Sequence, residues 1–190
     1  MIFKAIEIAS LVFGVIYIVM QVFQHKWMWY ADLITCVAAG TVAFHNDIWA
    51  TVGLNVYMFT MGVIGISKWK KLDGKTEKGA LHIVRLPRKT AILSIAAILV
   101  GGALIFWLLT KTSDPAPLAD SALLILTVFA AWWLTKSYIE QWYLWLVANV
   151  TGIVLFASQG LYWMSTLYFA YLVFAIIGIF NWRRKGQYVE

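Results

Sequence analysis

Long apolar segments separated by short polar clusters dominate the chain, and each segment is about 20 residues long. That length suits an α-helix crossing a hydrocarbon core about 30 Å thick, whereas a barrel strand needs only about ten residues of alternating polarity. The first segment is too long for a signal-peptide core, and no small-residue cleavage site follows it before Lys26. The pattern therefore predicts an all-α membrane protein with seven transmembrane helices: Ala5–Phe23, Trp27–Phe44, Ile48–Trp69, Ala91–Thr110, Leu118–Thr135, Gln141–Ala157 and Leu161–Trp182.

Lysine and arginine are distributed unequally between the two sides that seven crossings create. One side holds thirteen of the fifteen, eight of them between Lys68 and Lys89, and the other holds only Lys4 and Lys111. Because cytoplasmic loops are enriched in basic residues, we expect the N-terminus outside and the C-terminus in the cytoplasm. The net charge of +6 is then a topology signal. The basic loop has no interleaved aromatic residues, so no nucleic-acid partner is expected.

The two halves of the chain match each other. Residues 1–69 align without a gap on residues 114–182, so that Trp29 falls on Trp142 and Trp69 on Trp182. Each copy holds three helices, and the extra helix at 91–110 restores the direction of the second copy. This repeat alignment predicts a 3+1+3 arrangement of parallel repeats, as found among transporters, with a substrate site near the midplane. The expected units are repeat 1 (1–69), basic loop and linker helix (70–113), and repeat 2 with the basic tail (114–190).

Composition narrows the function class. The chain is 62% hydrophobic and 13% charged, with a mean hydropathy of +0.78, which excludes an ordinary soluble enzyme. Its one cysteine, Cys36, excludes an internal disulfide. No Walker loop is present, the three histidines lack metal-ligand spacing, and no serine–histidine–acid set is evident. We expect no enzymatic activity, metal or cofactor.

Polar and aromatic residues at membrane depth mark a candidate ligand site. Asn149 is about 12 Å from one end of its predicted helix, Asn55 is about 10 Å from the end of its own, and Trp145 is one turn from Asn149. Rings beside amides suit a flat heteroaromatic ligand, and a cationic ligand gains further from the ring faces. The candidate residues are Trp145, Asn149, Asn55, Tyr57, Phe59, Tyr168 and Tyr171.

Each of these residues also has a structural interpretation. Membrane asparagines can simply join helices, and tryptophans form interfacial belts, as we expect for Trp27, Trp49, Trp69, Trp163 and Trp182. Asp32 is close enough to its helix end to pair with Lys26 or water, an interpretation we favour over a ligand role. Gate or structural roles are expected for Glu7, Asp32, Asp120 and Glu140.

The segment from Tyr138 to Val150, continued by the segment from Phe156 to Tyr162, resembles the second half of the PnuC family of bacterial vitamin transporters. Trp145 and Asn149 match the family's W-x-x-x-N signature, and Gln159 with Gly160 match its glutamine–glycine turn. Glu7 and the stretch 55–57 look like first-half segments. The resemblance implies the 3+1+3 fold, the bacterial inner membrane, and ATP-independent facilitated diffusion with trapping by a cytoplasmic kinase. It also points to a homotrimer, and it adds Gln159 to the substrate-binding candidates.

The substrate interpretation depends on two departures from the family pattern. The family's nicotinamide riboside carriers have glutamine where Asn55 stands and asparagine where Thr35 stands. The aromatic half of the site is thus retained while the partner for a sugar is changed, and Thr35 becomes a candidate site residue. Thiamine is cationic and aromatic without a ribose, so the pattern favours the thiamine branch. Nicotinamide riboside is the alternative, followed by riboflavin.

Two other classes remain open at this point. A sugar carrier of the SWEET type shares seven helices and parallel repeats, but the intramembrane prolines usual there are absent, since Pro87, Pro115 and Pro117 lie outside the predicted spans. A membrane scaffold without transport would use the asparagines only for helix packing.

Overall fold

Seven helices and two short strands make up the computed structural model, which describes residues 2–73 and 80–189 without the side chains of residues 2, 3, 7 and 73. Every predicted span coincides with one helix, and the ends differ by no more than four positions. The helices are α1 (Ile2–Val22), α2 (Met28–His45), α3 (Trp49–Asp73), α4 (Arg88–Leu109), α5 (Pro117–Thr135), α6 (Gln141–Ser158) and α7 (Tyr162–Lys185).

Six of the seven helices are long and apolar enough to cross a membrane. The exception is α2, whose mean hydropathy is lowered by Asp32 and His45 although its length of 18 residues matches that of α6. One boundary needs correction, because Pro117 occupies the first turn of α5 instead of preceding it. Proline is favoured there, since the first amide of a helix has no intrahelical partner to lose.

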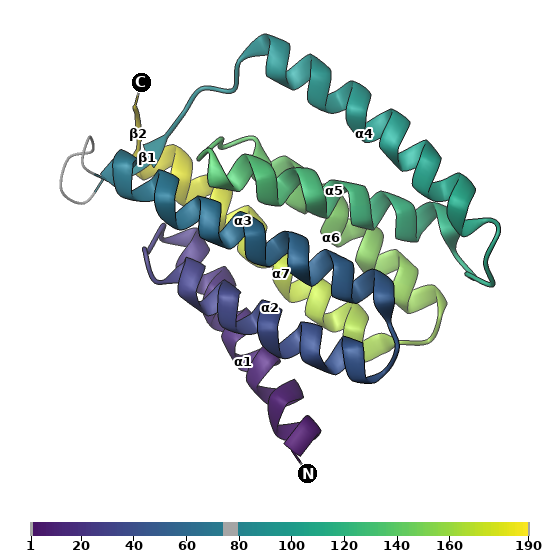
Figure 1. Ribbon diagram of the computed structural model, residues 1–190. Coiled ribbons are helices and arrows are strands. Elements are labelled where there is room, and N and C mark those ends of the chain that lie inside the picture. Colours follow the sequence, from purple (N-terminus) through teal and green to yellow (C-terminus); the bar gives the residue numbers. More distant parts are fainter. Residues whose placement is uncertain (1, 74–79, 190) are drawn as a thin grey trace.

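Six helices form a closed ring. Neighbours in the chain pack together within α1–α3 and within α5–α7, and two further contacts, α3 with α5 and α7 with α1, join the triplets at both edges. Helix α4 stands outside the ring and packs on α5, as Figure 1 shows. Its anchor is Ser94, which accepts a hydrogen bond from Trp133 Nε1 at 3.3 Å.

Four helices end in the same way. The second residue after each has a positive φ: 50° at Gln24, 57° at Asp47, 57° at Ser137 and 74° at Gly160. In each turn the following amide donates back to a carbonyl five positions earlier, for example His25 N to Met20 O and Tyr138 N to Trp133 O. This is the Schellman cap, which satisfies carbonyls that a helix end leaves unpaired. In the repeat alignment the turn at Gln24 is equivalent to that at Ser137, and the turn at Asp47 to that at Gly160.

Two tryptophan–glycine contacts also recur in the repeat. The indole of Trp29 lies against Gly65, and the indole of Trp142 lies against Gly178. Each of these indoles meets another edge-on, Trp29 with Trp69 at 5.0 Å between ring centroids and Trp142 with Trp182 at 5.6 Å. These matches support the division into residues 1–69, 70–113 and 114–190, which itself stays a prediction.

Trp69 and Trp182 are not belt residues. Their exposed fractions are 2% and 0%, because each indole crosses to the other triplet. Trp69 Nε1 donates to Leu134 O at 3.2 Å, and Trp182 Nε1 donates to Gln21 O at 3.3 Å. Trp27, Trp49 and Trp163 are exposed, as a belt requires.

The strands lie at the end of the bundle that carries most of the basic residues. Strand β1 (Leu81–Ile83) pairs in parallel with β2 (Gly186–Tyr188), and neither strand is evident from the apolar pattern. Gln24 exchanges two hydrogen bonds with the backbone of His82, and Val84 N donates to Ser137 O. The described part of the basic loop therefore ties together the α1–α2 turn, the α5–α6 turn and the C-terminal tail.

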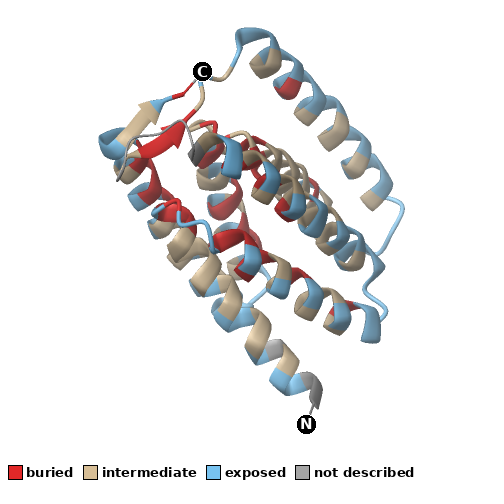
Figure 2. Ribbon diagram, turned by 60° about the vertical axis from the view of Figure 1, so that its left-hand side comes forward, coloured by how far each residue is buried: buried red, intermediate tan, exposed pale blue. Residues whose placement is uncertain are grey.

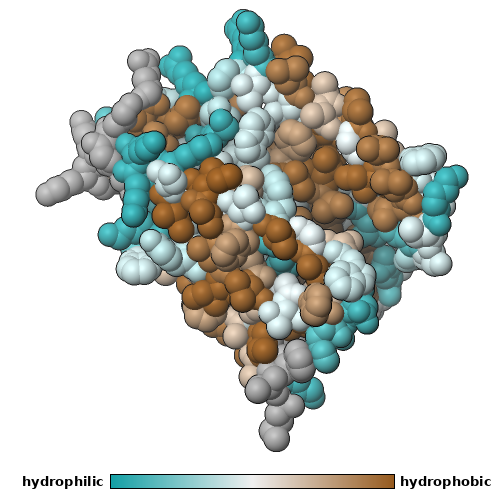
Figure 3. All heavy atoms as spheres, in the orientation of Figure 1, coloured by the Kyte–Doolittle hydropathy of each residue, from teal (hydrophilic) through white to brown (hydrophobic). Residues whose placement is uncertain are grey.

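The outer surface is that of a protein in lipid. Buried residues gather toward the strands and the inner faces of the ring, whereas α4 is almost entirely unburied (Figure 2). Apolar residues cover much of the side of the bundle, with hydrophilic residues mainly toward its ends (Figure 3). Large apolar side chains such as Val100 and Phe180 are about 70% exposed, which water would penalise and hydrocarbon does not.

The tryptophan–glycine contact can be tested by adding one methyl group. A Cβ at residue 178 would lie 2.5 Å from the Trp142 ring, so Gly178→Ala forces the helices apart and costs about 1–3 kcal/mol. We expect a lower melting temperature of the purified protein in detergent.

Gly53→Ala is the matched control, because residue 53 lies in α3 and its Cβ would meet nothing within 4 Å. Alanine is the better helix former, so this variant should melt no earlier than wild type. Equal melting temperatures for wild type and Gly178→Ala would contradict the packing described.

Candidate functional site

A cavity of about 230 Å³ lies inside the ring, and all six ring helices contribute to its wall. Most of the wall is apolar or aromatic, with a small number of polar groups, which is the usual character of a small-molecule site. The lining residues are Gly14, Tyr17, Ile18 and Gln21 from α1, Asp32, Thr35 and Cys36 from α2, Asn55 and Met58 from α3, Leu123 and Thr127 from α5, Trp145, Ala148 and Asn149 from α6, and Tyr168, Tyr171 and Ala175 from α7.

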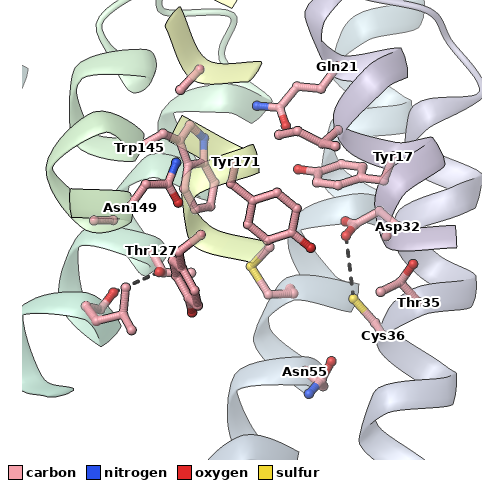
Figure 4. Close-up of a pocket in the computed structure, with 17 residues that line it drawn as sticks. Tyr17, Gln21, Asp32, Thr35, Cys36, Asn55, Thr127, Trp145, Asn149 and Tyr171 are labelled. Carbon is pink, nitrogen blue, oxygen red and sulfur yellow. Dashed lines mark hydrogen bonds between the residues drawn. The ribbon is translucent and has the colours of Figure 1, made fainter. Parts of the chain in front are cut away.

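One wall is built by α6. Trp145 and Asn149 are one helical turn apart, and both side chains reach the cavity, as Figure 4 shows. Asn149 is 4% exposed, and no described residue makes a hydrogen bond to its side-chain amide. The Trp145 Nε1 atom is likewise buried without an acceptor among the described residues. Buried polar groups are rarely left unpaired, so this wall offers a ring face, an amide and an indole N–H to a ligand.

The opposite wall is built by α2 (Figure 4). Asp32 is 4% exposed and accepts a hydrogen bond from Cys36 Sγ at 3.7 Å. Lys26, the predicted partner of Asp32, is exposed at the end of the bundle, and Asp32 contributes to the cavity wall instead. Asp32 is the only carboxylate among the lining residues, and no lysine, arginine or histidine lines the cavity with it.

Two threonine side chains at the cavity present oxygen atoms that serve as hydrogen-bond acceptors. Thr35 Oγ1 donates to Ala31 O at 2.9 Å, and Thr127 Oγ1 donates to Leu123 O at 2.7 Å, each within its own helix. Because the single hydroxyl hydrogen is used in this way, the remaining lone pairs can only accept. The cavity therefore offers acceptors suited to a ligand that carries hydroxyl groups.

Helix α7 supplies two tyrosines. Their rings meet at 6.0 Å between centroids and an interplanar angle of 69°. The ring of Tyr168 lies against Gly152 of α6, where any Cβ would collide with it. Because Gly152 has no side chain, the Tyr168 ring can lie against α6. The Tyr171 hydroxyl points toward Gly14 of α1.

The cavity is closed toward the basic end of the bundle. Gln21 and Gln141 are both fully buried, and Gln21 Nε2 donates to Gln141 Oε1 at 3.3 Å across the two triplets. Beyond this pair lies the main buried cluster, which contains four tryptophans: Trp29, Trp69, Trp142 and Trp182. Asn181 adds a hydrogen bond from Nδ2 to Val22 O at 2.7 Å.

Three predicted site residues lie outside this cavity. Tyr57 points toward α5, where its hydroxyl donates to Val128 O at 2.8 Å. Phe59 lines a neighbouring lateral groove between α2 and α3, which shares Cys36 and Asn55 with the cavity, and it is 39% exposed. Gln159 follows the last residue of α6 and is exposed at the turn before α7. The predicted residues that do line the cavity are Trp145, Asn149, Asn55, Tyr168, Tyr171 and Thr35.

Asp120 and Glu140, two further predicted acidic residues, are not among the lining residues. Asp120 is in the first turn of α5, and Glu140 immediately precedes α6. Glu7 belongs to α1, but its side chain is outside the described residues. Gate roles for these three residues stay predictions.

Several lining residues were not predicted: Gly14, Tyr17, Ile18, Gln21, Cys36, Met58, Leu123, Thr127, Ala148 and Ala175. Most are apolar or singly polar residues on helices whose rotation the sequence does not fix. Cys36 is different, because the repeat alignment places it on Asn149 and places Asp32 on Trp145. The repeat therefore carried a signal for both residues.

The cavity holds no catalytic constellation that we recognise. Among the described residues, no group of three or more histidine, cysteine or acidic side chains lies close enough to hold a metal ion. The arrangement suits binding of a ring-containing molecule by stacking, by amide and hydroxyl hydrogen bonds, and by one carboxylate.

Comparison with known proteins assigns the family. Residues 4–184 match the family model for nicotinamide mononucleotide transporters. The nicotinamide riboside transporter PnuC of Escherichia coli (strain K12) is 26% identical over 207 residues, covering 96% of this chain and 86% of the relative. The riboflavin/roseoflavin transporter RibM of Streptomyces davaonensis is 22% identical over 181 residues, covering 93% of this chain and 83% of the relative.

A solved structure has the same fold. The crystal structure of the vitamin B3 transporter PnuC superposes with a TM-score of 0.72 at 21% identity, covering 93% of this chain and 79% of that one. Together with the helices described above, these matches show a multi-pass protein of the bacterial inner membrane. The chain belongs to the nicotinamide mononucleotide transporter family, the PnuC family of vitamin transporters.

Proposed function

We propose that this protein carries nicotinamide riboside into the cell by facilitated diffusion. The observation that carries the proposal is the cavity inside the six-helix ring, where Trp145 and Asn149 lie opposite Asp32 and Thr35. A pyridinium ring can stack on the indole, its carboxamide can pair with the Asn149 amide, and ribose hydroxyls can donate to Thr35 and Thr127. We expect no chemical change of the ligand.

The substrate assignment departs from the thiamine expectation. The relatives that match over most of the chain are named as transporters of nicotinamide riboside and of riboflavin, so they give thiamine no support. The two changed first-half positions count less against a sugar than the sequence suggested. Asn55 keeps a shorter amide at the cavity wall, and Thr35 and Thr127 present acceptor oxygens to ligand hydroxyl groups.

The transport cycle is a rocking of intact triplets around a fixed site, which is the motion that parallel repeats favour. Hydrogen bonds donated by four side chains join the triplets at one end, so an opening at that end must break them: Gln21, Trp69, Asn181 and Trp182. Facilitated diffusion stops when the ligand concentrations on the two sides are equal, so continued uptake would be drawn by a cytoplasmic kinase that phosphorylates and traps the ligand. A homotrimer is the assembly that we expect.

We propose further that the seven helices run as 3+1+3 with the N-terminus outside. The strand end holds eleven of the described basic residues against two at the other end, and cytoplasmic loops retain such residues. The closed end of the cavity then faces the cytoplasm.

Ligand binding to wild type and two α6 variants tests the assignment. Nicotinamide riboside should release or absorb heat on titration into purified wild type. Asn149→Leu leaves the ligand amide unpaired, which costs about 1–3 kcal/mol and weakens binding about 5- to 150-fold. Trp145→Leu removes the stacking surface and should weaken binding at least about tenfold.

Phe59→Leu is the matched control for loss of an aromatic ring, because Phe59 lies in the lateral groove. Its dissociation constant should equal that of wild type. Binding of thiamine or riboflavin without binding of nicotinamide riboside would reject the substrate but keep the site. Binding unaffected by Asn149→Leu and Trp145→Leu would reject the site.

Reporter fusions test the orientation. Green fluorescent protein at the C-terminus should fluoresce, because it folds in the cytoplasm, and alkaline phosphatase at the same position should be inactive there. The opposite pair of results would show that the C-terminus is outside.

A further inference from the structure

Asp32 is a buried carboxylate that the proposed contacts with ring, carboxamide and ribose leave unused. Its exposed fraction is 4%, and it accepts a hydrogen bond from a thiol, Cys36 Sγ, at the long distance of 3.7 Å. No lysine, arginine or histidine shares the cavity wall with it. An ionised carboxylate in such surroundings is costly unless it is paired, so a positively charged ligand is the partner that would stabilise the ionised form of Asp32.

The repeat alignment places Asp32 at a position that matters for a ligand. Asp32 and Cys36 correspond to Trp145 and Asn149, and α2 corresponds to α6. The two pairs of side chains therefore occupy related positions on facing helices. Figure 4 shows them on opposite sides of one cavity, with Tyr171 between them.

The rest of the cavity wall adds to the negative electrostatic potential that an ionised Asp32 would create in the cavity. The aromatic rings of Tyr17, Trp145, Tyr168 and Tyr171 line the same space, and the face of an aromatic ring attracts cations. Thr35 and Thr127 present lone pairs only, for the reason given above. A carboxylate, ring faces and acceptor oxygens together form a site that favours a positively charged ring over a neutral one of equal shape.

We propose that Asp32 is the counter-ion of the ligand and selects positively charged heteroaromatic rings, such as a pyridinium or thiazolium, over neutral rings of the same shape. This inference rests on the proposed function only for the location of the ligand and not for its name. It replaces the expectation that Asp32 pairs with Lys26 or water, and it identifies a specificity residue on the wall opposite Trp145 and Asn149.

The test compares ligands that differ in charge and hardly in shape. One pair is nicotinamide riboside and its reduced 1,4-dihydro form, which is neutral. The second pair is thiamine and 3-deazathiamine, in which a neutral thiophene replaces the thiazolium. Dissociation constants of each pair are measured by calorimetry on the purified full-length protein in detergent or nanodiscs, for wild type and for Asp32→Asn.

We expect wild type to prefer the cation of the bound pair by at least about tenfold, as close charge pairs do at interfaces. Asp32→Asn keeps the shape and removes the charge, so the cation should bind at least about tenfold more weakly. The neutral member should bind within about twofold of wild type, which also shows that the variant is folded. Asp47→Asn, a matched change at an exposed turn residue, should leave both constants unchanged.

Asp32→Glu covers the case in which Asp32→Asn loses both ligands, because it retains the charge. Retained cation preference in Asp32→Glu supports the proposal, and loss of that preference overturns it. Equal affinities of wild type for the cation and the neutral analogue overturn it as well. If only the thiamine pair binds, nicotinamide riboside is rejected as the substrate, and the role of Asp32 is then tested with the thiamine pair. If neither cation binds, both proposals are rejected.

Discussion

Four tryptophans at one end of the bundle hold the six-helix ring together. Trp29 and Trp142 lie on glycines within their own triplets, and Trp69 and Trp182 donate hydrogen bonds to the backbone of the opposite triplet. Gly65 and Gly178 have no side chain, so the indole rings can lie directly against the backbone of the neighbouring helix. The cluster fixes the helices at this end, and farther along the bundle they surround a cavity instead of packing against one another. The cavity, its closed end and the facing of α2 and α6 all depend on this cluster.

The helices could be predicted from sequence because a bilayer imposes length and apolar composition on each span. Their rotation could not, and the site shows the consequence. Asn55, Tyr57 and Phe59 are neighbours in sequence, yet at about 100° per residue Tyr57 points away from Asn55 toward α5. Phe59 shares a face with Asn55 but reaches the lateral groove instead of the cavity. Long-range pairing was equally hidden, since β1 and β2 are very short and lie in distant parts of the chain.

Features that occur in both repeats were easier to predict from the sequence. The repeat alignment matches the four Schellman turns in two pairs and matches the two tryptophan–glycine contacts with each other. It also places Asp32 at the position equivalent to Trp145. The same alignment places Asp32 and Cys36 on Trp145 and Asn149, so it also indicates the wall that faces α6. Trp69 and Trp182 were assigned to the belt because they end their spans, although the strands and turns that cover them bury both.

The functional account depends on one location, the space between the α2 wall and the α6 wall. A structure of the purified protein determined with nicotinamide riboside tests it most directly. The account predicts ligand density inside the ring, with the pyridinium between Trp145 and Asp32 and the ribose toward Thr35 and Thr127. Density in the lateral groove at Phe59, or an interior filled by side chains with no ligand, would contradict it.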